Sequence, residues 1–212
     1  MLKLMKNVFS PSETTAVIRA LRERRTTGPL RFDSAAEPDH AVVAEAVESA
    51  RWAPNHKRTE PWRFFLLNKD RIGALADVNA ERMRRNGASE ANIEAKHREW
   101  SSKPGVMIVL CQHAAEHDDI LRKENYAACA AAAQNFQLHL FASGIASKWS
   151  TAACWDVPGF WELLGFEGWP ELVEPVGIFS YGVPASVPPA RRNLDRTEIL
   201  RNFRETGDAP AG

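Results

Sequence analysis

The sequence predicts an α+β fold with one mixed, mainly antiparallel central sheet surrounded by helices. Two observations indicate this class. Apolar runs of strand length and helical stretches follow one another irregularly, without the regular alternation of a β/α protein. No repeat, low-complexity block or Gly/Ser-rich linker interrupts the 212 residues. We therefore expect a single domain that spans residues 1–212.

The first part of the chain contains two predicted helices. The first helix is expected over residues 13–24, with Ser12 as its N-cap. The second begins near Pro38 and Asp39, directs valines and alanines inward, and ends before Pro54.

Apolar runs predict the strands of the sheet. Residues 64–67, 106–111 and 174–181 are each rich in apolar residues and have Pro or Gly close by, which is typical of buried strands. Residues 146–152 are expected to form a short strand or a turn.

Helical stretches separate these strands. Residues 69–100 are rich in Arg, Glu and Ala and predict two exposed helices with a break near Asn86 and Gly87. Residues 119–143 predict a long, alanine-rich helix that ends at Gly144. This helix fits either the centre of the core or a dimer interface, and the sequence favours neither. A short helix is expected over residues 157–164.

The composition excludes several functional classes. Lys plus Arg and Asp plus Glu number 27 each, which argues against a nucleic-acid-binding protein. The three cysteines are widely spaced and predict neither a disulfide framework nor a metal site. No apolar run of about 18 residues exists and the N-terminus lacks a signal-peptide core, so we expect a cytoplasmic protein without membrane association.

The first candidate site consists of Arg24, Arg25 and Thr26 at the end of the first helix. Two permanently charged guanidinium groups and a hydroxyl are well suited to a phosphate group. Alternatively, arginines near a helix C-terminus only interact with the helix dipole. Taken alone, these three residues favour that simpler explanation.

The second candidate site is the loop within residues 51–63, which is rich in Trp, His and Pro. His56 can donate a hydrogen bond to a ligand, and Trp52 and Trp62 can pack on an aromatic ring. The alternative is a solvated basic loop whose two tryptophans belong to the core.

The third candidate site is the segment 144–152. Its backbone amides and the hydroxyls of Ser150 and Thr151 can line a flat ligand, with Trp149 beside it. A structural turn after the long helix explains the same residues. Rossmann, P-loop and nucleophile-elbow motifs are missing, so an enzymatic activity would depend on a cofactor rather than on a catalytic side chain.

Together, the three candidate sites resemble the nitroreductase family of flavoproteins, in particular its compact members. The resemblance covers roughly residues 13–184 and rests on the order of several motifs along the chain. These motifs are Arg24–Arg25–Thr26, Ala53–Pro54 with His56–Lys57, Pro61–Trp62–Arg63–Phe64, the Trp-containing segment after Gly144, and residues 176–184 (VGIFSYGVP).

The resemblance implies an intertwined homodimer that binds FMN at the subunit interface. Arg24, Arg25 and Thr26 then contact the phosphate and the ribityl chain, and Arg191 or Arg192 adds a second phosphate contact. The flavin ring is expected to contact a further set of residues, with His56 coming from the partner subunit: Trp52, His56, Trp149, Ser150 and Thr151.

The resemblance also implies ping-pong transfer of hydride from NADH or NADPH through flavin N5 to a small-molecule acceptor, such as a nitroaromatic or a quinone. Lys148 or Lys57 is a candidate cation near flavin N1 and O2. The alternatives are another FMN-dependent reaction, such as dehydrogenation or dehalogenation, and a flavin-sequestering protein without turnover. Residues 69–100, which cover the substrate in many family members, do not identify the acceptor.

Overall fold

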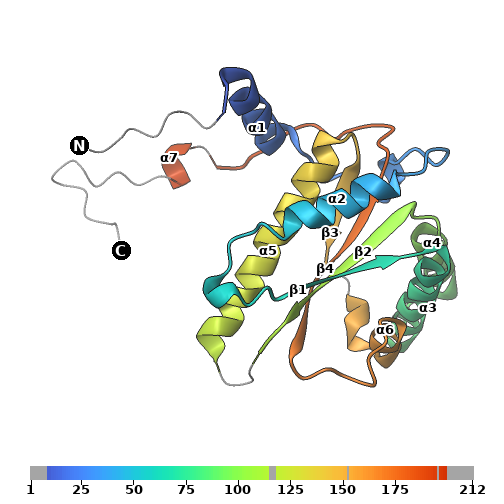
Figure 1. Cartoon of the computed structure of the whole chain (residues 1–212). Helices are drawn as coiled ribbons and strands as arrows, with labels where there is room; N and C mark the ends of the chain where they lie inside the picture. The colour runs from blue at the N-terminus through green and yellow to red at the C-terminus, as the bar shows by residue number, and fades with distance from the viewer. Residues whose placement is uncertain (1–8, 115–117, 152, 195, 200–212) are drawn as a thin grey trace.

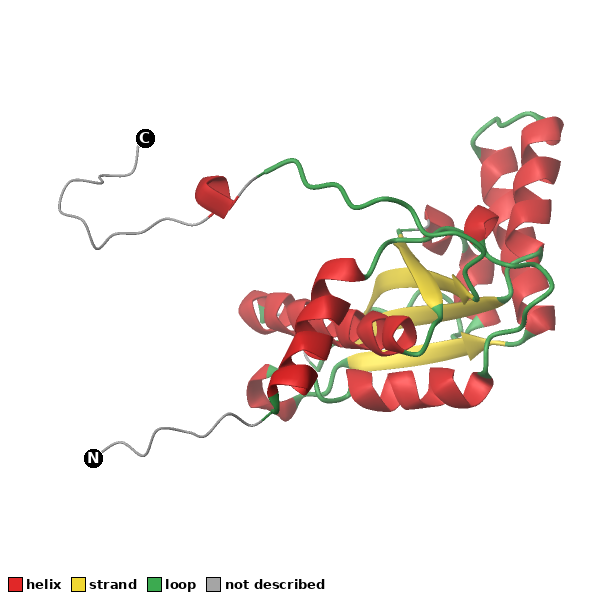
Figure 2. Cartoon of the chain, turned by 90° about the horizontal axis from the view of Figure 1, so that it is seen from above, coloured by secondary structure: helices red, strands yellow, loops and turns green. Residues whose placement is uncertain are grey.

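A four-stranded sheet lies between two layers of helices in the computed structural model, which describes residues 9–114, 118–151, 153–194 and 196–199. α2 and α5 cover one face of the sheet, and α3, α4 and α6 cover the other (Figures 1 and 2). The strands are β1 (Trp62–Leu67), β2 (Gly105–Gln112), β3 (Ala146–Ser150) and β4 (Val173–Gly182). The helices are α1 (Pro11–Glu23), α2 (His40–Ala50), α3 (Lys69–Arg85), α4 (Glu90–Ser101), α5 (Asp119–Ala142), α6 (Pro158–Leu163) and α7 (Arg196–Ile199), with short 3-10 turns η1 (Pro29–Arg31), η2 (His56–Arg58) and η3 (Ala153–Asp156).

The strands pair in the order β1-β2-β4-β3, and each of these pairs is antiparallel. The expectation of a mixed sheet was therefore wrong. Among the described residues, the parallel pairing is confined to an isolated bridge between Thr26 and Ser147. Apolar runs reveal which residues form strands, but they carry no information about the direction in which two strands pair.

α1 begins earlier than expected, because Ser10 rather than Ser12 is its N-cap. The backbone N–H of Glu13 donates to Ser10 Oγ at 3.3 Å, and the N–H of Ser10 donates to the Glu13 carboxylate at 2.8 Å. No residue of α1 is buried, and Val17, Ile18 and Leu21 remain 41–53% exposed. In the described part of the chain, the apolar face of this helix therefore has no cover.

α5 packs against the sheet and against α2, so part of this helix belongs to the core. Ala132, Ala133 and Phe136 are fully buried, and they share a cluster with Val43 and Ala46 of α2. The small alanine side chains allow the two helices to approach closely. This observation supports the core interpretation for the buried face of α5 and leaves the dimer interpretation untested.

α3 and α4 form a helical hairpin, as predicted, with a break that includes Gly87 at a φ of 74°. The expectation that both helices are exposed was wrong for one face. Ile72, Leu75 and Ile93 are at most 3% exposed. Ile72 and Leu75 belong to a second core cluster, on the face of the sheet opposite to α2 and α5. Their helical spacing was hidden in the sequence by the many charged residues on the outer faces.

Gly144 stops α5 and turns the chain into β3, as the sequence predicted. Ser143 is the C-cap, and Gly144 follows it with a φ of 80°. The N–H of Ile145 donates to the carbonyl of Leu140 at 2.8 Å, and the N–H of Gly144 donates to Phe141 at 3.1 Å. This Schellman motif places the start of β3 beside the end of α1.

No helix in the described ranges combines the length and apolarity needed to cross a bilayer.

Candidate cofactor site

The end of α1 carries a buried guanidinium group with an unused donor. Nη1 of Arg24 is buried and has no hydrogen-bond partner among the described residues. Arg25 behaves differently, since its Nη1 donates to the carbonyls of Arg22 at 2.6 Å and Arg24 at 2.9 Å. A buried, charged donor without an acceptor is costly. Arg24 is therefore suited to an anionic ligand, whereas Arg25 also stabilises the end of the helix.

Positive charges gather around Arg24. Burial lowers the pKa of its guanidinium, and the charges of Arg192 and Arg25 lower this pKa further. Among the described residues, no carboxylate shifts the pKa of Arg24. The structure thus brings Arg192, from the tail of the chain, close to the end of α1. Arg191 has no comparable influence on Arg24, and its carbonyl accepts a hydrogen bond from Arg192 Nη1 at 2.8 Å.

A pocket opens beside these arginines, between α1, the end of α5 and the start of β3. Thr27 rather than Thr26 lines it. Thr27 is 1% exposed and donates its backbone N–H to the carbonyl of Ser147 at 3.0 Å, while Thr26 is exposed. We call this the arginine pocket. It is lined by Arg24, Arg25, Thr27, Phe141, Gly144, Ile145, Ala146, Ser147, Pro184 and Val187.

A second pocket lies at the other end of β3, on the face of the sheet that α4 covers. It contains Lys148, Ser150 and Thr151, and the side chain of Lys148 passes close to Gly28. We call it the lysine pocket. Its lining residues are Pro29, Lys96, Glu99, Trp100, Lys103, Lys148, Ser150, Thr151, Ile178 and Ser180.

Lys103 is a site residue that sequence reasoning missed. It is only 6% exposed, and its Nζ lies 3.7 Å from the centroid of the Trp100 ring. Burial lowers the pKa of the Lys103 ammonium to about 8; Glu99 opposes this shift, and Lys96 and Lys148 add to it. A weak signal was present in the sequence, because Lys103 stands two residues before the buried strand that begins at Gly105.

Trp149 does not share the lysine pocket with its neighbours Ser150 and Thr151. Its Nε1–H donates to the carbonyl of Val176 at 3.0 Å, and its ring centroid lies 5.2 Å from that of Phe179. Successive side chains in a strand point to opposite faces. Trp149 therefore belongs to the core on the α5 side, while Lys148 and Ser150 face α4.

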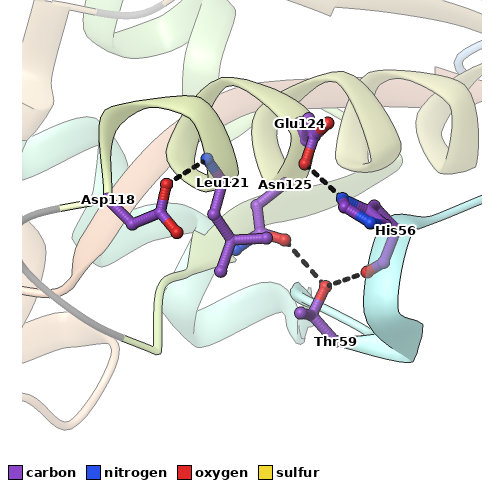
Figure 3. Close-up of polar contacts among 6 residues, drawn as sticks. All are labelled: His56, Thr59, Asp118, Leu121, Glu124 and Asn125. Carbon is purple, nitrogen blue, oxygen red and sulfur yellow. Dashed lines mark hydrogen bonds and ion pairs between the residues drawn. The ribbon is translucent and has the colours of Figure 1, made fainter.

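The loop that contains His56 is anchored to α5 (Figure 3). His56 Nδ1 lies 2.6 Å from the Glu124 carboxylate, and Thr59 Oγ1 donates to Asn125 Oδ1 at 2.7 Å. Lys57 has a φ of 55°, a left-handed conformation that is unusual for a residue other than glycine. Such strain persists only where surrounding contacts hold it.

The tryptophans beside this loop have different environments. Trp62 is buried in the core, whereas Trp52 is 81% exposed. Within this chain, neither His56 nor Trp52 lines the arginine pocket or the lysine pocket.

In the described ranges, no group of three or more His, Cys, Asp or Glu side chains is arranged to hold a metal ion.

Comparison with known proteins identifies the family. The sequence profile of the nitroreductase family matches residues 21–182. The chain belongs to the nitroreductase family. One curated relative is a protein of Bacillus subtilis (strain 168) that carries the provisional name NAD(P)H nitroreductase YfhC. It is 27% identical over 115 residues, which are 52% of this chain and 58% of YfhC.

Solved structures share the nitroreductase fold. A nitroreductase-like family protein from Bacillus cereus matches with a TM-score of 0.73 and 25% identity, over 95% of this chain and 100% of its own. A nitroreductase-type protein from Desulfovibrio desulfuricans, solved with FMN, matches with a TM-score of 0.65 and 20% identity over 88% and 95% of the two chains. Iodotyrosine deiodinase bound to FMN and 3-iodo-L-tyrosine matches with a TM-score of 0.65 and 15% identity, over 89% and 99%.

Proposed function

We propose that this protein binds FMN and that the arginine pocket holds the FMN phosphate. The buried and unpartnered Nη1 of Arg24 carries this proposal, because a phosphate oxygen supplies the acceptor that this donor lacks. Arg25 and Arg192 add positive charge on the same side. The membership of the chain in the nitroreductase family and the FMN in two of its structural neighbours support this choice of ligand.

The lysine pocket is the corresponding site for the flavin ring. A strand rises about 3.3 Å per residue, so Ala146 in the arginine pocket and Ser150 in the lysine pocket lie about 13 Å apart. The loop from Thr27 to Pro29 follows the same course beside β3. This length suits a ligand with a phosphate at one end and a flat ring at the other. Ser150 and Thr151 supply polar groups at the ring end.

The activity that we propose is reduction of a small acceptor, such as a nitroaromatic or a quinone, by NADH or NADPH in a ping-pong sequence. Bound FMN supplies the hydride-accepting and hydride-donating centre. The protein positions the ring and its reactants, and Lys148 contributes positive charge at the edge of the ring. The name of the Bacillus subtilis relative supports a reaction of this type.

We also propose that the protein acts as a homodimer. The apolar face of α1, formed by Val17, Ile18 and Leu21, is not covered by any residue that the structure describes, and Leu30 and Trp52 are 93% and 81% exposed. A second copy that covers these side chains removes apolar surface from water. In such a dimer, Trp52 and His56 of one subunit reach the flavin ring of the other. The hydrogen bonds that join His56 to Glu124 and Thr59 to Asn125 support a fixed position for this loop.

Two measurements test this function. Purified protein is expected to bind FMN, with a shifted flavin absorption spectrum, and anaerobic NADH or NADPH is expected to bleach it. Subsequent addition of a nitroaromatic or a quinone restores the oxidised spectrum. A flavin that binds but stays oxidised under both nucleotides favours the flavin-sequestering alternative. Failure to bind FMN contradicts the proposal as a whole.

A further inference from the structure

Lys103 is a buried cation that faces the lysine pocket. It lies at the junction between the end of α4 and the start of β2, where it is only 6% exposed. In the described part of the chain, its Nζ forms no hydrogen bond and no ion pair, and it makes a cation–π contact with the ring of Trp100. Removal of most of the water around an ammonium is energetically unfavourable, and an aromatic face offsets only part of this cost. The ammonium of Lys103 is therefore available to an occupant of the lysine pocket.

The charged groups around Lys103 do not neutralise it. From α4, Lys96 and Glu99 pair with each other at 2.7 Å. From β3, Lys148 adds positive charge, and Cys154 of η3 is a further titratable neighbour. From α3, Lys69 Nζ donates to the backbone carbonyl of Lys103 at 3.5 Å. The pocket thus favours negative charge in its occupant.

We propose that Lys103 stabilises the negative charge of the reduced flavin ring and takes up a proton as this charge forms. This inference rests on the proposed function, because it requires the ring to occupy the lysine pocket. Lys148 also lines the pocket, but Lys103 is more deeply buried. A charge interaction is stronger where water is excluded, so the buried lysine has the larger effect on the ring.

The proton balance follows from the burial of Lys103. Burial lowers its pKa to about 8 in the flavin-free chain. An oxidised ring carries no net charge and keeps water away from the amine, so we expect a mainly neutral amine above about this pH while the ring is oxidised. Reduction by two electrons adds one proton to the ring and leaves one negative charge there. That charge raises the pKa of Lys103, which then binds a second proton from solvent. Above about pH 8, two protons are therefore taken up per two electrons. Just below this pH, Lys103 is already protonated before reduction, so one proton is taken up per two electrons.

The reduction potential of the bound FMN tests this inference. Equilibrium titration with redox dyes is made at steps from about pH 7 to about pH 9.5. In the unaltered protein, the slope of potential against pH is expected to double above about pH 8. Lys103→Met removes the titrating charge, so the slope of potential against pH stays at the one-proton value over the whole range. In this variant, the ratio of the affinity for reduced FMN to that for oxidised FMN is expected to fall at least tenfold. Lys103→Arg keeps the charge but does not titrate in this range, so it also gives a single slope.

Lys69→Met is the matched control, because Lys69 contacts the backbone of Lys103 but does not line the pocket. This variant is expected to keep the change of slope. An unaltered protein that binds FMN but shows one slope throughout overturns the inference and leaves the proposed function intact. A change of slope that persists in Lys103→Arg also overturns the inference and leaves the proposed function intact. A protein that binds no FMN overturns both proposals.

Discussion

The backbone N–H of Thr27 donates to the carbonyl of Ser147 at 3.0 Å, and this bond joins the end of α1 to the edge of the sheet. Ser147 is itself held in place, because its Oγ accepts a hydrogen bond from Gln137 Nε2 of α5 at 3.0 Å. The chain that follows Arg24 is therefore attached to β3, and the end of α1 is not free. The arginine pocket and the lysine pocket are aligned by the same strand.

Replacement of Arg24 is expected to weaken FMN binding most. Arg24→Met removes a charge-assisted hydrogen bond worth about 1.5–3 kcal/mol, so the Kd for FMN rises roughly 10- to 150-fold. Fluorescence quenching of FMN measures this Kd. Arg22→Met, on the exposed side of α1, is the control and should bind FMN as the unaltered protein does. Equal affinity in both variants would remove Arg24 from the phosphate site.

The two tail arginines are expected to differ. Arg192 influences the charge of Arg24, whereas Arg191 does not. Arg192→Met should therefore weaken FMN binding and reduce its dependence on ionic strength, while Arg191→Met should change neither. Titrations at low and high salt distinguish the two variants. A larger loss in Arg191→Met would show that the tail is arranged differently when FMN is bound.

The apolar face of α1 is expected to support dimerisation. Leu21→Glu places a charge in the centre of this face, so sedimentation velocity should show a shift from dimer towards monomer. Arg22→Glu, at the next position and also exposed, places a glutamate outside the face and should remain dimeric, although it changes the charge by two units instead of one. A monomeric unaltered protein, or a dimer that tolerates Leu21→Glu, contradicts the proposed assembly.

Gly177 is expected to be essential for packing. A Cβ at this position of β4 would lie 2.1 Å from Trp149 Nε1, so Gly177→Ala should lower the free energy of unfolding by about 1–3 kcal/mol or more. Gly73→Ala, in α3, is the control, because a Cβ there meets no atom of the described residues within 4 Å. That change should stabilise the protein by about 0.5–1 kcal/mol. Urea unfolding followed by circular dichroism measures both.

The buried Lys103 is expected to make flavin-free protein less stable near neutral pH. Its pKa falls from 10.5 to about 8 on folding, so between these values the unfolded chain binds more protons and stability rises with pH. The cost of burial is present in full below about pH 8 and is lost as the pH approaches 10.5. It is of the order of 3 kcal/mol.

Lys103→Met should accordingly stabilise the flavin-free protein more at pH 7 than at pH 10. Urea unfolding of both proteins at the two pH values gives this difference directly. An equal effect at both pH values would mean that Lys103 is solvated in the folded chain.

Local interactions explain which parts of the fold could be predicted. The break between α3 and α4 and the end of α5 depend on Gly87 and Gly144, whose positive φ angles are decided by the residue itself. The start of α1 was predicted two residues late, since Ser10 and Ser12 are both able to cap a helix. The reciprocal bond between Ser10 and Glu13 selects the earlier cap.

The sequence by itself determined the order of helices and strands and the helix-ending glycines, and it predicted Arg24 as a phosphate ligand, which stays a prediction. The tertiary structure decided that the sheet is antiparallel, that Thr27 and not Thr26 enters the arginine pocket, and that Lys103 is buried at a pocket that it shares with Lys148. Caps and turns depend on residues a few positions apart. The environment of Lys103 depends on strands and helices that are distant in the sequence, and only folding brings their side chains together.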